Sequence, residues 1–150
     1  MVKVIAEIGI NHNGSLDIAK KLIDVASIAG CDYVKMQKRN PDVCVPEHQK
    51  SVMKKTPWGE MTYLDYKYKL EFGHDEYDEL YHYASEKGIG FFASVWDKDS
   101  VDFMSNYGAM MKIPSALITD DTLIKYARKN SDYLMISTGM RDEREIEAAV

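Results

Sequence analysis

The sequence predicts an α/β fold built on a parallel sheet. Short aliphatic segments alternate with segments whose apolar residues recur at helical spacing, and this alternation repeats five times in 150 residues, of which 45% are hydrophobic. At roughly 30 residues, each unit has the length that a right-handed crossover between parallel strands needs.

Two architectures share this pattern, an open doubly wound sheet and a (β/α)8 TIM barrel. A barrel typically needs about 250 residues, so in that case the chain supplies about the first five βα units. The last residues, 142–150, begin one more amphipathic helix without a capping glycine. We therefore expect residues 1–150 to be the N-terminal part of a longer barrel domain.

The expected elements follow in order along the chain. Ser15 caps a first helix whose apolar positions are Ile18, Ala19, Leu22, Val25, Ala26 and Ala29, and Gly30 ends it. Strands are expected at 2–9, 32–37, 90–96, 109–115 and 133–139. The other helices are expected at 75–87, 99–107 and 120–130.

One connection is much longer than a normal βα loop. Residues 38–74 separate the second strand from its helix, and the part from 56 to 73 is dense in aromatic residues. One interpretation is a lid or a ligand-binding loop. The other is a small helical insertion whose aromatic side chains pack on the rim of the fold, and the two are compatible.

The composition of the chain argues against nucleic acids and membranes as binding partners. The net charge is −5 and the basic residues are dispersed, which argues against a nucleic-acid surface. Cys31 and Cys44 are too few for a disulfide framework and lack metal-site spacing, as is typical of the reducing cytoplasm. Neither a signal-peptide core nor a run of about 18 apolar residues is present, so we expect a cytoplasmic protein with no membrane partner.

Polar side chains occur near the carboxyl end of every expected strand, where parallel α/β folds bind their ligands. They are Glu7, Lys35, Gln37, Ser94, Lys112, Ser115, Ser137 and Thr138. A charge inside a strand costs several kcal/mol unless it is paired or solvated, so one such residue alone favours a structural ion pair. The repetition on all five strands favours a site instead.

Two lysines at one mouth of an acidic protein indicate an anionic ligand, either carboxylate or phosphate. Glu7 has three candidate roles there: pairing with the lysines, binding a sugar hydroxyl, or general-base catalysis. His12, beside the turn Asn13-Gly14, is typical of a hydrogen-bonding turn residue rather than a metal ligand. Nucleotide-binding, zinc-ribbon and serine-hydrolase motifs are all missing from the sequence.

Four ordered motifs resemble those of the sialic acid (N-acetylneuraminate) synthase family, enzymes that make nine-carbon 2-keto sugar acids. They are "AEIGINHNGSLDIAKKLIDVASIAGCDYVKMQ", "FFASVWD", "MKIPS" and "LMISTGM", and the resemblance covers essentially the whole chain. It implies a TIM barrel that condenses phosphoenolpyruvate with an N-acyl hexosamine and releases phosphate, a transferase of the EC 2.5.1 type.

The resemblance also implies roles for single residues. Glu7, Lys35 and Lys112 would be catalytic, with Glu7 near the sugar aldehyde or a metal-bound water. The residues that would hold the carboxylate and phosphate of phosphoenolpyruvate are Lys35, Ser94, Lys112, Ser115 and Ser137. Gln37 and Thr138 complete the expected substrate-binding set.

Further parts of such an enzyme are expected outside this chain. The family uses a divalent metal, Mn²⁺ or Mg²⁺, held by two histidines on later strands, and a small C-terminal antifreeze-like domain completes the site across a homodimer. We therefore expect residues 1–150 alone to be inactive.

Departures from the family pattern leave the acceptor sugar open. Trp96 and Asp97 stand where many members have phenylalanine and serine, and Pro114 replaces a glycine. Two other functions compete with the synthase. One is a Schiff-base aldolase with Lys35 or Lys112 as nucleophile, and the other is a non-catalytic barrel fragment that binds sugars or anions.

Overall fold

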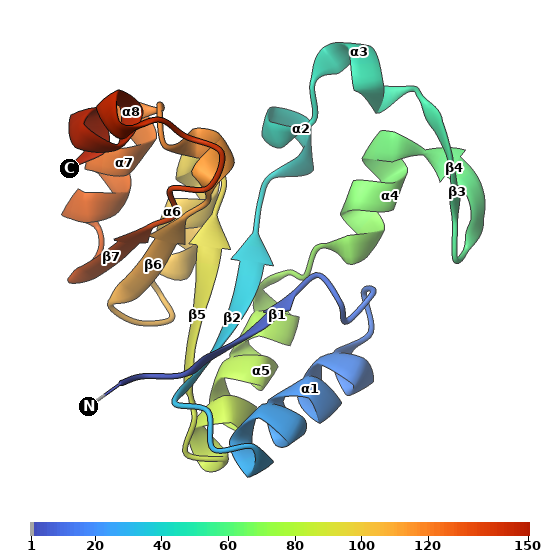
Figure 1. Cartoon of the computed structure of the whole chain (residues 1–150). Coiled ribbons are helices and arrows are strands. Elements are labelled where there is room, and N and C mark those ends of the chain that lie inside the picture. Colours follow the sequence, from blue (N-terminus) through green and yellow to red (C-terminus); the bar gives the residue numbers. More distant parts are fainter. Residues whose placement is uncertain (1) are drawn as a thin grey trace.

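The structure, a computed structural model, describes residues 2–150 and contains one five-stranded sheet whose neighbouring strands are all parallel (Figure 1). Its strands are β1 (Ile5–Gly9), β2 (Tyr33–Lys38), β5 (Gly90–Val95), β6 (Met110–Ile113) and β7 (Tyr133–Ile136). Their order in the sheet, β1-β2-β5-β6-β7, is also their order in the sequence. A doubly wound sheet reverses its order at a switch point, so that alternative is wrong.

Helices cover one face of the sheet and leave the other uncovered. The helices are α1 (Leu16–Ile28), α5 (His74–Glu86), α6 (Lys98–Met104), α7 (Asp121–Lys129) and α8 (Glu143–Ala149). Side chains of α1, α5, α6 and α7 form the core together with alternate residues of the strands, such as Val34, Ala93 and Met111. The strand residues in between these core positions point their side chains to the uncovered face. Within residues 2–150, β1 and β7 are the free edges of the sheet, so barrel closure stays a prediction.

The βα alternation is confirmed, with corrections at the ends of elements. The fourth strand, expected to reach residue 115, ends at Ile113 because Pro114 cannot donate to a ladder, and Ser115–Leu117 form a short 3-10 helix. The strand expected at 133–139 ends at Ile136, and the helix expected at 99–107 ends at Met104.

Helix α1 begins and ends as the sequence predicts. The Oγ of Ser15 accepts from the backbone N–H of Ile18 at 3.3 Å. The predicted apolar face was too wide, because Ile18 and Val25 are 41% and 64% exposed. The buried stripe is Ala19, Ile23 and Ala26, at positions i, i+4 and i+7, and Ile23 was missing from the predicted face.

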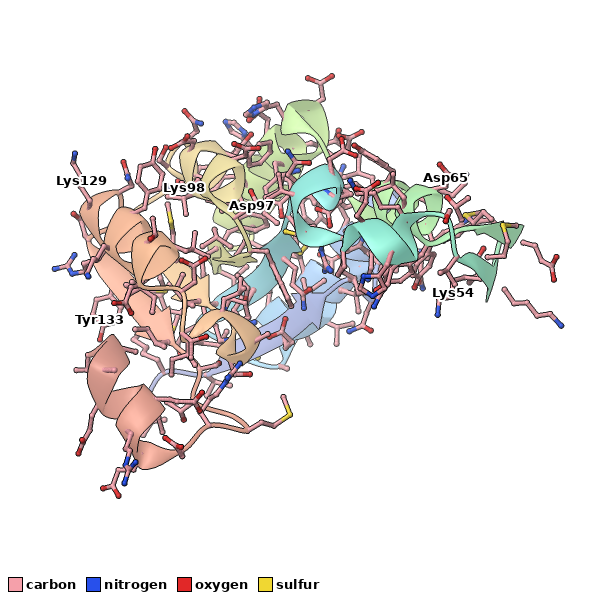
Figure 2. All side chains as sticks on the ribbon, turned by 90° about the horizontal axis from the view of Figure 1, so that it is seen from above. Lys54, Asp65, Asp97, Lys98, Lys129 and Tyr133 are labelled. Carbon is pink, nitrogen blue, oxygen red and sulfur yellow. The ribbon has the colours of Figure 1, made fainter. Side chains whose placement is uncertain are left out.

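The long insertion, 38–74, contains helices and a hairpin. Its elements are α2 (Pro41–Cys44), α3 (Glu47–Lys50), the antiparallel pair β3 (Met53–Thr56) and β4 (Gly59–Thr62), and α4 (Tyr63–Leu70). The sequence predicted helices but missed the hairpin. Phe72 is buried whereas Trp58 and Tyr68 stay exposed, so only part of the aromatic set packs on the fold. Figure 2 shows the insertion, marked by Lys54 and Asp65, on the opposite side of the molecule from Lys129 and Tyr133.

None of the helices in residues 2–150 has the length and apolar content that crossing a membrane requires.

Candidate functional site

Strand register places the predicted polar residues on the uncovered face of the sheet. Glu7 of β1 is opposite Lys35 of β2. Two residues further along β2, Gln37 is opposite Ser94 of β5, which is in turn opposite Lys112 of β6. Because side chains alternate along a strand, all five point to the same side, away from the helices.

Lys35 is the buried centre of this group. It is 6% exposed, and its Nζ pairs with Oε2 of Glu7 and donates to Oγ of Ser94 at 3.1 Å. These two partners offset the cost of burying an ammonium group. The Glu7 side chain is 52% exposed, so the carboxylate both pairs with Lys35 and faces open space. The ion pair predicted as one role of Glu7 is confirmed, and its exposure leaves the other two roles available.

Lys112 differs from Lys35 because it belongs to none of the ion pairs within residues 2–150. Burial lowers its pKa, and the positive charge of Lys35 lowers it further, against a smaller opposing effect of Glu7. Such an ammonium group, half-buried beside a second cation, is stabilised by an anion that binds between them.

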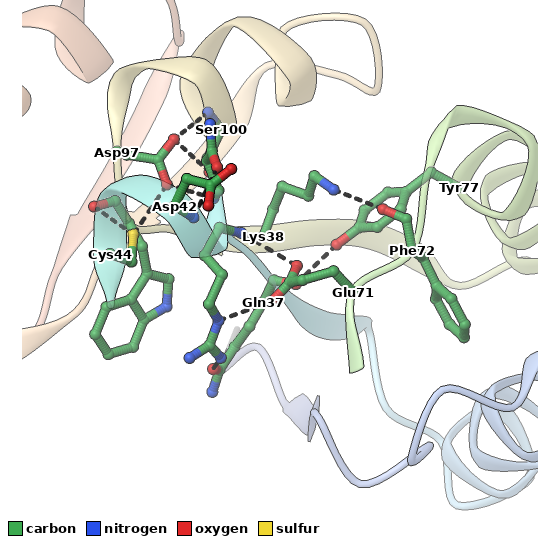
Figure 3. Close-up of polar contacts among 12 residues, drawn as sticks. Gln37, Lys38, Asp42, Cys44, Glu71, Phe72, Tyr77, Asp97 and Ser100 are labelled. Atoms are coloured by element: carbon green, nitrogen blue, oxygen red, sulfur yellow. Dashed lines mark hydrogen bonds and ion pairs between the residues drawn. The ribbon is translucent and has the colours of Figure 1, made fainter. Parts of the chain in front are cut away.

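Gln37 reaches the same space from the end of β2. A Cβ built on Gly9 would lie 3.1 Å from Oε1 of Glu7 and 3.4 Å from Nε2 of Gln37, so both side chains border Gly9. The Oε1 of Gln37 accepts from Nη2 of Arg39 at 2.5 Å (Figure 3). Arg39 was missed by the sequence analysis, although its position directly after a polar strand end was a usable signal.

Three predicted residues lie at the ends of the neighbouring strands without a hydrogen bond to the lysines within residues 2–150. Ser115 starts the 3-10 helix after β6, and its Oγ would lie 3.6 Å from a Cβ on Gly139. Ser137 follows β7, where its backbone N–H donates to the carbonyl of Ile113 at 3.0 Å. Thr138 is exposed.

His12 is a turn residue, as predicted, and it is also buried. Its Nδ1 accepts from the backbone N–H of Gly14 at 3.1 Å, and it is 2% exposed. The imidazole stacks on Phe72 of the insertion, with ring centroids 4.3 Å apart, a contact that the sequence did not predict. Burial lowers the pKa of His12 to about 4.

A metal site is not formed by the described residues. Within residues 2–150, no three side chains among histidine, cysteine, aspartate and glutamate come together in a way that could hold an ion.

Asp97, at a position where the sequence departs from the family pattern, has a structural role. Its Oδ1 caps α6 by accepting from the backbone N–H of Ser100 at 2.7 Å. Its Oδ2 accepts from the backbone N–H of Asn40 at 2.7 Å and from the thiol of Cys44 at 3.1 Å (Figure 3). Burial, with a further contribution from Asp97, raises the pKa of Cys44 to about 12. Asp97 thus joins the insertion to the end of β5.

Comparisons with known proteins agree on one family. A sequence profile described as the NeuB family matches residues 22–150. The chain is 36% identical over 150 residues to the N,N'-diacetyllegionaminic acid synthase of Campylobacter jejuni, an alignment that covers 98% of this chain and 45% of that protein. It is 36% identical over 141 residues to the N-acetylneuraminate-9-phosphate synthase of Homo sapiens, covering 92% of this chain and 39% of the relative.

A solved structure shares the fold over nearly the whole chain. The N-acetylneuraminic acid (sialic acid) synthetase of Leptospira borgpetersenii, crystallised in complex with citrate, matches with a TM-score of 0.85 at 29% identity. The match covers 99% of this chain and 48% of that one. The chain thus spans a little under half the length of the relatives that it matches.

Proposed function

Because the chain belongs to the NeuB family, the sialic acid and nonulosonate synthases, we propose that the whole protein is a phosphoenolpyruvate-dependent synthase. It joins phosphoenolpyruvate to an N-acyl hexosamine, releases phosphate and makes a nine-carbon 2-keto sugar acid. The observation that carries the proposal is the pair of lysines on the uncovered face, one bound to Glu7 and the other without an ion-pair partner in residues 2–150.

Each side of this group of polar residues is suited to one of the two substrates. Lys35 and Lys112, with Ser94, hold the carboxylate and phosphate of phosphoenolpyruvate, and Ser115 and Ser137 extend that set along β6 and β7. Positive charge beside the phosphate stabilises it as it leaves. Glu7 and Gln37, on the β1 side, face the amino sugar.

The reaction proceeds in two bond-forming steps. The methylene carbon of phosphoenolpyruvate attacks the carbonyl carbon of the sugar aldehyde and forms the new C–C bond, while the aldehyde C=O π bond breaks and its oxygen takes up a proton to become a hydroxyl. This leaves an oxocarbenium at C2. Water then adds at C2 and gives up one proton, and the C2–O bond to phosphate breaks as the second proton of that water leaves, which gives the ketone and free phosphate. Glu7 is suited to accept a proton from that water or to bind a hydroxyl of the sugar, because its carboxylate is half exposed and is paired with Lys35.

Four properties of the whole protein remain part of the proposal: the metal, the closed barrel, the location and the oligomeric state. We expect a divalent metal, Mn²⁺ or Mg²⁺, on ligands outside residues 2–150, where it would polarise the sugar aldehyde. We also expect a closed TIM barrel and a cytoplasmic homodimer.

A phosphate-release assay on the full-length protein tests the function. Phosphoenolpyruvate and Mn²⁺ are supplied with a panel of N-acyl hexosamines, and phosphate is expected only when a suitable sugar is present. Binding of phosphoenolpyruvate without release for any sugar would favour the non-catalytic alternative.

One observation favours a second candidate, the Schiff-base aldolase. The lowered pKa of Lys112 beside Lys35 is a feature of lysines that act as amine nucleophiles. Borohydride treatment in the presence of pyruvate separates the two functions, because the aldolase gives a covalent adduct on the chain and the synthase gives none.

A further inference from the structure

The amide of Gln37 is held in one orientation by Arg39. A guanidinium only donates hydrogen bonds, so the amide atom that faces it is the oxygen. The Nη2 of Arg39 donates to that oxygen at 2.5 Å. The NH₂ group of Gln37 is therefore directed to the other side, where its Nε2 borders Gly9, the glycine that Oε1 of Glu7 also borders.

Arg39 is itself fixed by a buried carboxylate. It is 8% exposed, and its Nε lies 2.8 Å from Oε1 of Glu71. The backbone N–H of Arg39 donates to Oε2 of Glu71 at 3.3 Å, and the guanidinium lies 5.0 Å from the ring centroid of Trp96. Both side chains of the Arg39–Glu71 pair are only 9% exposed, so removing one partner leaves the other charge buried and unpaired.

Glu71 comes from the far end of the insertion, which is anchored at this place. It is the C-cap residue of α4. The next residue, Phe72, stacks on His12 of the β1–α1 loop, and its carbonyl accepts from Nζ of Lys38 at 2.5 Å. Figure 3 shows Gln37, Lys38 and Glu71 converging from β2 and from the end of the insertion. The fold of residues 38–74 therefore ends in a contact with the site.

We propose that Arg39 and Glu71 are positioning residues that turn the amide NH₂ of Gln37 toward the acceptor sugar. The inference rests on the proposed function, because it takes Glu7 to mark the sugar side of the site. An amide N–H there donates to a hydroxyl or carbonyl oxygen of the N-acyl hexosamine. Phosphoenolpyruvate, held by the lysines, makes no use of this donor.

A double-mutant cycle on the full-length enzyme tests whether Arg39 affects sugar binding by orienting Gln37. Arg39→Lys keeps the charge but loses the fork that holds both Glu71 and Gln37. Arg39→Lys and Gln37→Ala are each expected to raise the KM for the sugar about tenfold and to leave the KM for phosphoenolpyruvate unchanged. The double variant is expected to be no worse than Gln37→Ala alone, because Arg39 acts through that residue.

Tyr68→Phe is the matched control, since it removes a hydrogen bond from the Tyr68 hydroxyl to Asp42 within the same insertion but does not touch Gln37. Its KM values should equal those of the unaltered enzyme. Additive effects in the double variant, or an equal rise in both KM values, would overturn the inference.

A second readout does not depend on activity. In protein labelled with ¹⁵N on glutamine side chains, the NH₂ signal of Gln37 is the one lost in Gln37→Ala. Glu71→Gln and Arg39→Lys are expected to shift it and Tyr68→Phe to leave it in place. If the Gln37 signal shifts in these two variants but the unaltered protein releases no phosphate with any sugar, the proposed function is wrong and the positioning role is supported. If the signal stays in place in both variants, the positioning role is wrong.

Discussion

Lys35 of β2 forms an ion pair with Glu7 of β1, directly across the strand register, and its ammonium group also donates to Ser94 of β5. One buried cation therefore links three neighbouring strands on the face that the helices leave uncovered. The two partners of this ion pair differ in exposure, because Lys35 is buried while the carboxylate of Glu7 is half exposed.

Lys112→Met separates function from stability. Burial lowers the pKa of Lys112, so the unfolded chain binds its proton more tightly than the folded chain. The folded state therefore bears a cost for the charge at neutral pH, and stability rises with pH between the lowered pKa and the ordinary value of 10.5. We expect Lys112→Met to leave Tm at pH 7 unchanged or raised and to reduce phosphate release at least about 100-fold.

Lys125→Met is the control for this substitution, because Lys125 is an exposed lysine of α7. It should alter neither Tm nor phosphate release. A Lys112→Met protein that stays active would remove Lys112 from the proposed site.

His12→Gln tests the pH dependence of stability. The folded-state pKa of His12 is about 4, against 6.5 for an ordinary histidine, so the unfolded chain takes up a proton first as the pH falls. Stability is thus lost from about pH 6.5 downward and the loss levels off below about pH 4, a difference of about 3 kcal/mol. Urea unfolding between pH 4 and 7 should show that His12→Gln removes this component.

His82→Gln provides the comparison, since His82 is exposed on α5. Its pH profile should follow that of the unaltered protein. Equal slopes for His12→Gln and the unaltered protein would show that His12 is not buried as a neutral ring.

Gly14→Ala and Gly30→Ala form a matched pair. Both glycines have positive φ angles, 68° and 76°, so alanine is strained at either position. A Cβ on Gly14 would lie 2.1 Å from the carbonyl oxygen of Lys69, whereas a Cβ on Gly30 meets nothing within 4 Å. We expect Gly30→Ala to cost about 1 kcal/mol and Gly14→Ala about 3 kcal/mol or more, measured by denaturant unfolding. Equal losses of unfolding free energy in the two variants would mean that the insertion does not pack closely against the β1–α1 loop.

Asp97→Asn tests the joint between the insertion and β5. The carboxylate accepts hydrogen bonds from Ser100 at Oδ1 and from Asn40 and Cys44 at Oδ2, and an amide nitrogen in place of either oxygen repels the donors that face it. We expect a loss of about 2–4 kcal/mol in unfolding free energy. Alkylation of Cys44 at pH 8, slow in the unaltered protein because the pKa is about 12, should become faster. Unchanged alkylation together with unchanged stability would contradict this role.

Much of the arrangement of the candidate site could be predicted from strand periodicity and from the parallel order of the strands. Glu7, Lys35 and Lys112 were found because side chains of a strand alternate and because parallel strands present their carboxyl ends at one edge. The prediction needed no knowledge of tertiary contacts, since the five strands of the parallel sheet lie in it in the order in which they occur in the sequence, with β3 and β4 in a separate hairpin.

The position of Arg39 after a strand end was a usable signal, but its contacts with Gln37 and Glu71 could not be predicted in the same way. They depend on how residues 38–74 fold, and the hairpin in that segment shows no regular alternation of apolar and polar residues. The contact of His12 with Phe72 likewise joins residues 60 positions apart through a non-repeating structure. The width of the α1 face was misjudged for another reason, since an apolar residue on a helix can still face water, as Val25 does.

Phosphate and sugar acid, measured together in the full-length protein, test the proposed synthase most directly. With phosphoenolpyruvate, Mn²⁺ and an accepted N-acyl hexosamine, we expect one phosphate for each nine-carbon sugar acid formed, and neither product in Lys35→Met. Phosphate release that is independent of the sugar, or sugar acid formed from pyruvate without phosphate, would show that the protein is not such a synthase.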